Sequence, residues 1–488
     1  MTIKKGDVFE FTIEKYAFEG KGIAKVNRDI FFPGEENNDE KKYVVFVNGS
    51  YPGDVVKAKL NKIKKTYAEA KAIEIISPSN ERVKAECQYF GTCGGCKQQD
   101  LGYQSQTKYK QQQVEEIFTR LGGLSIFEIE PILPSEIVFH YRNKMEYSFG
   151  GKRWLTLDEI SSGKDIDRNF ALGLHIPGMF DKILDINICY LQSPVSSKIL
   201  NLTRDFFKSR GTTIYSTNTH EGYLRNLVIK LSHNSDDLMV NLVTSYENDD
   251  MMNEYTTTLL KEVPEIKTVI NNINLKKAAV AVGDHEKIFF GSGFIYDSIG
   301  KYKFRISANS FFQTNTHQAE RLYSTVLNYA GLTGEEIVYD LYSGAGTISI
   351  YISSGAKKVY AFETVESAVA DANENIKLNN IENVGFVTAD LYKSFLPQLI
   401  ENNIPKPDVI VIDPPRSGMH ENTVNDVITL QPHKIVYVSC NPTTQVRDIK
   451  IFSAAGYKLI KIKPVDMFPQ TFHIENVALL VKEEEIVS

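Results

Sequence analysis

The first part of the chain alternates apolar and polar positions in short runs. Residues 8–26 alternate around two glycines, and residues 42–76 alternate through turns at Asn48-Gly49 and Pro52-Gly53. Alternation with a period of two predicts β-strands, and the turn pairs place these strands close together along the chain. We therefore expect residues 1–76 to form a small closed β-barrel.

From about residue 301 the pattern changes to strands that alternate with helices. A helix is predicted over Asn315–Ala330, whose apolar residues recur at helical spacing. Seven apolar runs read as strands: 337–342, 358–363, 385–388, 408–412, 434–439, 457–464 and 476–481. This alternation predicts a Rossmann-like α/β domain over residues 301–488, with a parallel sheet covered by helices on both faces.

The middle of the chain, residues 77–300, mixes both patterns. A helix is predicted over Tyr103–Leu121, and extended pieces follow at 141–150 and 172–177. We expect an α+β central domain here, but these patterns alone indicate no mechanism.

Composition and charge narrow the class of protein. The chain has 488 residues, of which 42% are hydrophobic and 24% are charged, with a net charge of −6. Six lysines against a single acid, Glu69, mark the segment 57–71, which fits either a solvated strand face or an RNA-binding surface. Because the N-terminus lacks an apolar signal region and no apolar run is long enough to span a bilayer, we expect a cytoplasmic protein with no membrane partner. Nothing in the sequence indicates a protein partner.

Polar residues follow successive strands of the predicted C-terminal sheet. The first strand ends in a glycine loop with Gly344 and Gly346, where Ser349 replaces the third glycine of a dinucleotide-binding motif. Glu363 ends the second strand, where a carboxylate can accept hydrogen bonds from two ribose hydroxyls. Asp390 ends the third strand, where it can accept from an adenine amino group. The missing glycine disfavours a pyrophosphate cofactor and favours S-adenosylmethionine.

A cysteine follows the fifth strand. Asn441-Pro442 directly after Cys440 turns the chain away, which places Cys440 at the strand tip beside Asp413, the end of the fourth strand. Taken alone, such a cysteine is more often a buried structural thiol. A catalytic role for this cysteine arises if the substrate is uracil. Carbon 5 of uracil becomes nucleophilic only after a thiolate adds to carbon 6, and a base must later remove the carbon 5 proton. Glu475, at the start of the last strand, is a candidate for that base, whereas His473 is expected to pack or orient.

Five motifs together resemble those of the RNA uracil-C5 methyltransferases. They are DLYSGAGTISI, DPPRSGM, SCNPTTQVRDI, FPQTFHIENVALL and, near the N-terminus, FVNGSYPGDVVKAKL, which resembles the OB-like TRAM barrel of RNA-modifying enzymes. The resemblance covers essentially the whole chain. It implies Cys440 as the nucleophile and Glu475 as the proton acceptor. It also implies five S-adenosylmethionine contacts: Gln313, Tyr342, Glu363, Asp390 and Asp413.

The other four cysteines are candidate metal ligands. They are Cys87, Cys93, Cys96 and Cys189. Four thiolates suit either zinc or an iron–sulfur cluster, and their spacing does not decide between the two. The pattern resembles the four-iron, four-sulfur (4Fe-4S) site of the ribosomal RNA members of the family. That resemblance implies a structural cluster in the central domain without a redox role in catalysis.

These observations predict methylation of carbon 5 of a uridine in RNA, with the 23S ribosomal RNA expected as the substrate. Transfer RNA with the same chemistry is the first alternative. An amino-group methyltransferase acting through the Asp413-Pro414-Pro415-Arg416 motif, which needs no cysteine, is a second. A non-catalytic RNA-binding iron–sulfur protein is a third. The sequence does not identify the target uridine or the oligomeric state.

Overall fold

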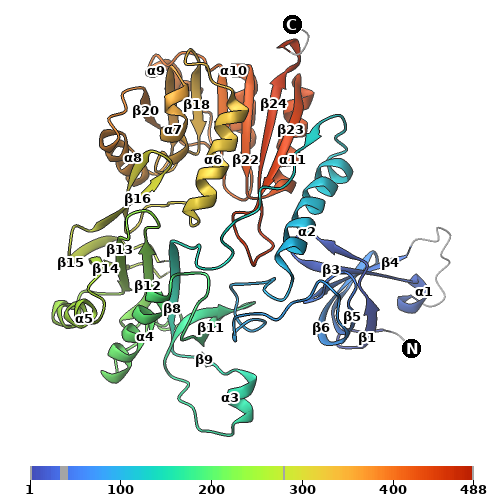
Figure 1. Ribbon diagram of the computed structural model, residues 1–488, viewed down its shortest axis with the longest axis vertical. Coiled ribbons are helices and arrows are strands. Elements are labelled where there is room, and N and C mark those ends of the chain that lie inside the picture. The colour runs from blue at the N-terminus through green and yellow to red at the C-terminus, as the bar shows by residue number, and fades with distance from the viewer. Residues whose placement is uncertain (1–2, 33–41, 278–280, 486–488) are drawn as a thin grey trace.

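The computed structural model describes residues 3–32, 42–277 and 281–485 and has three parts. Figure 1 shows a small β-barrel at one side, a central sheet below and a larger helix-covered sheet above. The ends of the expected N- and C-terminal domains, residues 1–2 and 486–488, lie outside the described residues. Within the part of the chain that is described, no helix is long and apolar enough to cross a membrane.

A six-stranded sheet forms the N-terminal barrel. Its strands are β1 (Val8–Thr12), β2 (Lys15–Ala17), β3 (Lys21–Val26), β4 (Tyr43–Asn48), β5 (Val55–Ile63) and β6 (Tyr67–Ser77), and the helix α1 (Arg28–Phe31) follows β3. The spatial order is β1-β5-β6-β4-β3-β2, and the sheet curls so that β1 approaches β3. Alternate residues of β5, such as Val56, Ala58 and Leu60, are fully buried. The small N-terminal barrel predicted from the alternating pattern is confirmed.

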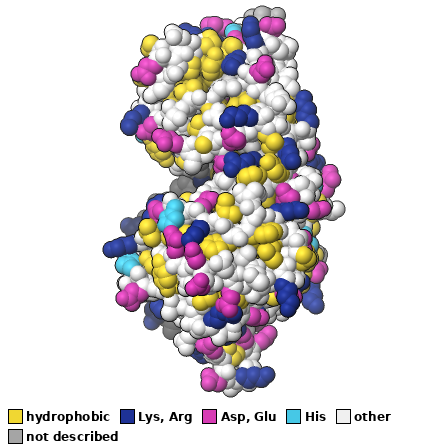
Figure 2. Space-filling model, turned by 90° about the vertical axis from the view of Figure 1, so that its left-hand side faces the viewer, with side chains coloured by type: hydrophobic (Ala, Val, Ile, Leu, Met, Phe, Trp, Pro, Cys, Tyr) yellow, Lys and Arg dark blue, Asp and Glu magenta, His cyan; other side chains and the backbone are white. Residues whose placement is uncertain are grey.

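The lysines of β5 face away from the barrel core, and several have acidic partners. Lys57 lies 2.8 Å from Glu74, and Lys62 lies 3.1 Å from Glu69, which also contacts Lys21 of β3. Exposed ion pairs of this kind add little stability, but they neutralise part of the basic run. On the face shown in Figure 2, basic and acidic side chains are interspersed rather than gathered into a patch of one sign.

The central part is built on an eight-stranded sheet. Its strands are β8 (Lys144–Gly150), β9 (Arg153–Trp154), β10 (Ala171–Ile176), β11 (Met179–Asp185), β12 (Leu224–Leu231), β13 (Leu238–Thr244), β14 (Ile266–Ile273) and β15 (His285–Phe290), in the order β15-β14-β13-β12-β8-β10-β11-β9. Its helices are α3 (Leu157–Ser161), α4 (Pro194–Ser209) and α5 (Asp249–Glu262). Helices α4 and α5 pack together and bury their apolar faces in the core that they share with the sheet.

The C-terminal part is a doubly wound sheet, as predicted. Its strands are β18 (Ile337–Leu341), β19 (Lys358–Glu363), β20 (Val384–Thr388), β21 (Val409–Ile412), β22 (Lys434–Ser439), β23 (Tyr457–Val465) and β24 (Glu475–Lys482). Its helices are α6 (Thr316–Ala330), α7 (Thr347–Ile352), α8 (Glu366–Leu378), α9 (Leu396–Glu401), α10 (Glu421–Leu430) and α11 (Pro442–Ala454). Strands β20-β19-β18-β21-β22 are parallel, and β24 adds antiparallel beside β22. The predicted strands 358–363 and 434–439 have the observed bounds.

A helix from the N-terminal half packs on this C-terminal sheet. Helix α2 (Tyr103–Glu116) continues as a π-helical stretch, η1 (Ile117–Leu121), and runs from the barrel along the sheet (Figure 1). Val114, Ile117 and Phe118 are buried in the core that contains the apolar residues of β18, β21 and β22. The next strand, β7 (Glu128–Ile129), pairs with β23 at the sheet edge. The C-terminal sheet is thus completed by residues that precede the central sheet.

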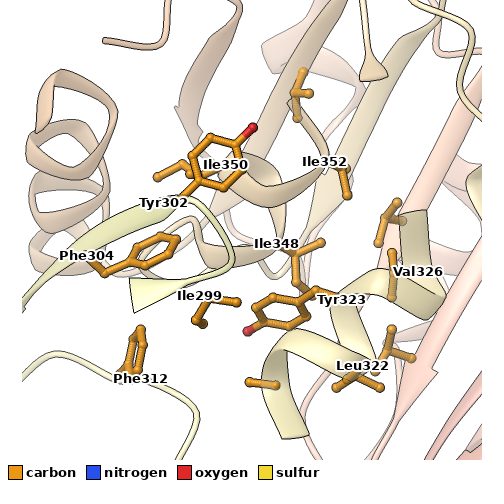
Figure 3. Close-up of a cluster of buried hydrophobic side chains, with 14 of the residues drawn as sticks. Ile299, Tyr302, Phe304, Phe312, Leu322, Tyr323, Val326, Ile348, Ile350 and Ile352 are labelled. Atoms are coloured by element: carbon orange, nitrogen blue, oxygen red, sulfur yellow. The ribbon is translucent and has the colours of Figure 1, made fainter. Parts of the chain in front are cut away.

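A hairpin, β16 (Phe294–Ile299) and β17 (Tyr302–Ser307), links the central and C-terminal parts. Figure 3 shows Ile299, Tyr302 and Phe304 of this hairpin beside labelled residues of α6 and α7. All of these side chains belong to one hydrophobic core. Strand β16 also lies near β13 and β14 of the central sheet, so the hairpin joins the two parts by direct packing.

Candidate active site

The carboxyl ends of the parallel strands open into a cavity of about 1210 Å³. Strand β18 has β19 on one side and β21 on the other, so the strand order reverses at this point. Ligands of doubly wound sheets bind at such a reversal. Six of the seven residues proposed from the sequence as catalytic or cofactor-binding line the cavity: Gln313, Tyr342, Glu363, Asp413, Cys440 and Glu475.

The glycine loop after β18 is joined to the end of β19. Gly344 and Gly346 have φ angles of 54° and 76°, in the left-handed region that glycine adopts without strain. The Gly344 N–H donates to Glu363 Oε2 at 2.9 Å, and Glu363 Oε1 accepts from the next two backbone N–H groups. These bonds orient the Glu363 carboxylate beside the loop. A Cβ atom at residue 346 would lie 2.5 Å from the Phe386 ring, so only glycine fits there.

Two polar side chains of the central part bind the loop between β17 and α6, which carries Gln313. Asn143 Nδ2 donates to the Gln313 carbonyl at 2.7 Å. Lys230 Nζ donates to the carbonyls of Ser307 and Ser310 at 2.7 and 2.9 Å, and burial lowers the Lys230 pKa to about 7. The central sheet therefore positions one wall of the cavity.

The register of the sheet brings the candidate nucleophile and base together. Ser439 on β22 pairs with Asn476 on β24. Cys440 directly follows β22 and Glu475 begins β24, so the two residues lie side by side where these adjacent strands meet the cavity. Asp413 follows β21, the other neighbour of β22. A thiol and two carboxyl groups therefore share one end of the cavity.

All three of these groups have a raised pKa. Burial raises the pKa of Asp413 to about 7 and is the main cause that raises the pKa of Cys440 to about 12. Burial, together with the negative charge of Asp413, raises the pKa of Glu475 well above its usual value. The two carboxylates also raise the Cys440 pKa, whereas the nearby cation Arg416 lowers it. The site thus favours protonated forms until a substrate or cofactor changes its charge balance.

The chain turns sharply after Cys440 because Asn441 caps α11. The Asn441 side chain accepts from the Thr443 N–H at 3.2 Å, and Pro442 occupies the first helical turn, where a missing N–H is tolerated. Asn441 Nδ2 also donates to the Arg416 carbonyl at 3.0 Å. This bond joins the Cys440 loop to the Pro414-Pro415-Arg416 loop.

His473 lines the same cavity but is poorly suited to act as a proton acceptor. Burial, with smaller contributions from nearby cations such as Arg416, lowers the His473 pKa to about 4. Its ring lies 4.6 Å from the Phe472 ring, centroid to centroid. A neutral, packed imidazole agrees with the packing or orienting role that we expect.

Asp390 is the one cofactor candidate that does not line the cavity. Its carboxylate accepts from the Tyr392 N–H at 3.0 Å and lies 3.1 Å from Lys393 Nζ, and both contacts lower the Asp390 pKa. The strand-end pattern placed Asp390 at the correct edge of the sheet but did not determine the direction of its side chain.

The other four cysteines lie against the core of the central part. Cys189 is buried, and Cys87, Cys93 and Cys96 pack on the same hydrophobic cluster. Burial raises the pKa of Cys93 to about 11 and of Cys96 to about 12, and the charges of the neighbouring thiolates add to both shifts. Gln99 Nε2 donates to Cys96 Sγ at 3.1 Å. Among the residues that the structure describes, no group of three or more His, Cys, Asp or Glu side chains has the geometry to hold a metal ion.

Two residues that bind the Gln313 loop, Asn143 and Lys230, were not predicted from the sequence. Lys230 stands in LRNLVIKL, an otherwise largely apolar strand, and a lysine at a buried strand position requires partners. That conflict between burial and charge was a usable signal. Its partners could not be identified, because they lie some 80 residues farther along the chain, on a loop.

Comparison with protein families identifies two matching regions. Residues 224–483 match the tRNA (uracil-5-)-methyltransferase family, and residues 3–73 match the TRAM domain. The first match includes the candidate residues Gln313, Cys440 and Glu475.

Individual proteins resemble the chain over nearly its full length. An uncharacterized RNA methyltransferase of Chlorobaculum tepidum is 42% identical, with 99% of this chain and 98% of the relative covered. Another, from Bacteroides thetaiotaomicron, is 41% identical over 95% of this chain and 99% of the relative.

A solved structure also matches the chain from end to end. It is the tRNA (uracil-54, C5)-methyltransferase of Pyrococcus abyssi in complex with S-adenosyl-L-homocysteine. The TM-score is 0.73 at 28% identity, and 97% of this chain and 99% of that chain are covered. The chain therefore belongs to the tRNA (uracil-5-)-methyltransferase family, carries an N-terminal TRAM domain and is an S-adenosylmethionine-dependent RNA methyltransferase.

Proposed function

We propose that this protein methylates carbon 5 of a uridine in RNA through a covalent bond between Cys440 and carbon 6 of the base. The observation that carries the proposal is the meeting of Cys440 and Glu475 on adjacent strands, in the cavity that Glu363 and Asp413 also line. An amino-group methyltransferase needs no such thiol. The Asp413-Pro414-Pro415-Arg416 motif alone therefore does not account for this arrangement.

The proposed reaction balances with these residues. The Cys440 thiolate adds to carbon 6, and the resulting enolate attacks the methyl group from carbon 5. Bound S-adenosylmethionine supplies that methyl group and leaves as S-adenosylhomocysteine. Glu475 takes the proton from carbon 5, and the electron pair of that C–H bond re-forms the double bond as the thiolate departs. Once Glu475 has lost its own proton, its raised pKa makes it a stronger base than an ordinary carboxylate.

The Cys440 thiol must lose its proton before addition. Since its pKa is about 12, only a small fraction is thiolate at neutral pH. The positive sulfonium of the cofactor, bound in the same cavity, would oppose the repulsion by Asp413 and Glu475. Cofactor binding and the nearby Arg416 are thus both expected to favour the thiolate form of Cys440.

The cavity also supports the proposed cofactor contacts. The Gly344 N–H donates to Glu363, and in the proposal this carboxylate accepts from ribose hydroxyls. Gln313 and Asp413 both line the cavity, one from the loop before α6 and one from the end of β21. Tyr342 lies next to the glycine loop and adopts a φ of 65°. Asp390 remains in the proposal only as a contact that would require its side chain to leave Lys393.

We also propose that Cys87, Cys93, Cys96 and Cys189 hold a 4Fe-4S cluster. A single zinc ion needs its four sulfur ligands about 2.3 Å from one point. A four-iron cluster binds each cysteine through a different iron and so accommodates sulfurs that stand farther apart. The four cysteines share one hydrophobic cluster, the charges of Cys87, Cys93 and Cys189 act on Cys96, and the cysteine pattern resembles the 4Fe-4S site of the ribosomal RNA members of the family, which favours the cluster over zinc. The cluster would be structural.

The RNA substrate is proposed to be the 23S ribosomal RNA, since the cysteine pattern resembles that of the ribosomal members of the family. The similar Pyrococcus abyssi enzyme is named for transfer RNA, and this favours transfer RNA as the second candidate. The target base must leave its stack to reach a cavity at strand ends. We assign the barrel, residues 1–76, and the central domain, residues 77–300, to RNA binding, and residues 301–488 to methyl transfer.

Mapping of 5-methyluridine tests both parts of this proposal. The purified protein is incubated with labelled S-adenosylmethionine and with ribosomal or transfer RNA from cells that lack its gene. Label in 5-methyluridine of 23S ribosomal RNA supports the proposal, and label only in transfer RNA moves the substrate to the second candidate. Label on an exocyclic amino group contradicts the chemistry.

A further inference from the structure

The loop that precedes Glu475 is bound on several sides by other parts of the chain. This loop, residues 466–474, joins β23 to β24 and contributes Phe468 and His473 to the cavity wall. Asp466, Met467, Gln470 and Thr471 are buried. Because Glu475 directly follows the loop, the position of the loop determines where the carboxylate can reach.

Helix α2 makes a buried ion pair with the start of the loop. Lys110 Nζ lies 2.6 Å from Asp466 Oδ1, and the two side chains are 1% and 0% exposed. Lys110 Nζ also donates to the Phe468 carbonyl at 3.2 Å, and Tyr103 Oη donates to Asp466 Oδ2 at 2.9 Å. A buried pair persists only where further hydrogen bonds satisfy both groups, and those bonds exist here.

The same helix makes a reciprocal amide pair with the middle of the loop. The Gln470 N–H donates to Gln106 Oε1, and Gln106 Nε2 donates to Gln470 Oε1, both at 3.0 Å. Gln470 has a φ of 66°, a conformation that residues other than glycine seldom adopt. Such a backbone persists where surrounding contacts enforce it, and it is common beside active sites.

The segment that follows Cys96 completes these contacts. The backbone N–H groups of Lys97 and Gln98 donate to the Gln470 carbonyl at 2.9 and 3.1 Å. Gln106 Nε2 also donates to the carbonyl of Gln98 at 2.9 Å. The cysteine segment, α2 and the 466–474 loop are therefore joined at Gln470.

We propose that Gln106 is a positioning residue for Glu475: helix α2 orients the 466–474 loop and, through it, the proton acceptor. The inference rests on the proposed roles of Cys440 and Glu475. Removal of the carbon 5 proton depends on the position of Glu475, whereas thiol addition and methyl transfer depend on Cys440 and the bound cofactor. Loss of the Gln106–Gln470 pair should therefore slow the last step most, and the covalent protein–RNA adduct should accumulate.

The test compares Gln106→Leu with Gln104→Leu, a matched control whose side chain is exposed on the same helix. In Gln106→Leu, kcat should fall roughly ten- to a hundredfold, as misplacement of a catalytic group by about an ångström does. The KM for S-adenosylmethionine should change less than about twofold, and the adduct fraction on denaturing gels should rise. Gln104→Leu should match the natural protein. A fall in kcat without more adduct would overturn the proposal.

A second variant guards against misfolding of the first. Gln470→Gly removes the bond from Gln106 Nε2 to Gln470 Oε1 and keeps the backbone N–H that donates to Gln106 Oε1. Because glycine suits the left-handed backbone, this variant should fold, and it should accumulate adduct, though less than Gln106→Leu does. Glu475→Gln, measured in parallel, separates the two proposals. If adduct forms in Glu475→Gln but not in Gln106→Leu or Gln470→Gly, the positioning role alone is rejected. If no adduct forms in any of the three variants, the proposed mechanism itself is rejected.

Discussion

The molecule has two places where cysteine is at least partly buried beside ionisable neighbours, and they differ in what surrounds the sulfur. Cys440 lies at the end of a cavity, between two carboxyl groups and one arginine. Cys93 and Cys96 lie against an apolar core, with other thiols and N–H donors as neighbours. Burial raises the thiol pKa to about 12 at both Cys440 and Cys96, so the pKa does not separate a nucleophile from a metal ligand.

The groups around each sulfur do distinguish the nucleophile from the metal ligands. A nucleophile needs space for a substrate and a base nearby, and Cys440 has both in the cavity and Glu475. A structural ligand needs other thiols and a dry, packed surrounding, which the four-cysteine group has.

The largest difference is expected from single alanine substitutions in the two places. Cys440→Ala should reduce methyl transfer by at least about 10⁴-fold, because Cys440 is the one thiol among the described residues that line the cavity. The melting temperature should stay within a few degrees. Activity within tenfold of the natural protein would remove the covalent mechanism and favour amino-group methylation.

Cys189→Ala should show the opposite pattern. Loss of one ligand should release the proposed cluster and lower the free energy of unfolding by several kcal/mol, since metal binding and folding are coupled. Some methyl transfer should remain in the fraction that stays folded. Protein purified without oxygen should contain about four irons per chain, and the variant should contain almost none. One zinc per chain in place of iron would contradict the cluster.

The pH dependence should report the raised pKa values at Cys440. With a thiol pKa of about 12, the thiolate fraction rises about tenfold per pH unit, and Glu475 also becomes a base only as it loses its proton. We expect kcat/KM for S-adenosylmethionine, which reports the groups of the enzyme before the cofactor binds, to rise steadily between about pH 6 and 8. A profile that is flat or falls over this range would contradict the thiol as nucleophile.

The smallest effect concerns stability at the same site. The Asp413 pKa is raised from 3.8 to about 7, so the folded state binds its proton more tightly than the unfolded state does. The natural protein should therefore lose stability relative to Asp413→Asn as the pH rises from about 4 to 7, with no further change above 7. The difference should reach about 1–2 kcal/mol in urea titrations. Asp390→Asn is the control. Because the Asp390 pKa is lowered, the natural protein should not lose stability relative to this variant over the same pH range.

Much of the C-terminal sheet could be predicted from the sequence. Runs such as 358–363 and 434–439 are long, apolar and bounded by polar turns, so local pattern is sufficient. Since parallel strands end at one edge, it also followed that Glu363, Asp413 and Cys440 would meet there. The family resemblance added Gln313, which lies outside the sheet on a loop.

Long-range packing could not be predicted. The pattern over 103–121 identified a helix, but no local signal shows that α2 packs on the C-terminal sheet or that Lys110 pairs with Asp466, 356 residues away. The mixed order of the central sheet was likewise hidden, because strand pairing depends on contacts between distant segments. Asp390 shows a further limit: its strand end was predicted, but its nearby partner Lys393 determines where the side chain lies.

The most direct test of the covalent mechanism is the mass of the Glu475→Gln variant after incubation with substrate RNA and S-adenosylmethionine. Without the carboxylate, carbon 5 keeps its proton after methylation, and the thiolate cannot leave. We predict a protein–RNA adduct that carries the added methyl group and maps to the peptide containing Cys440. Free methylated RNA at the normal rate, or an adduct on one of the other four cysteines, would contradict the account.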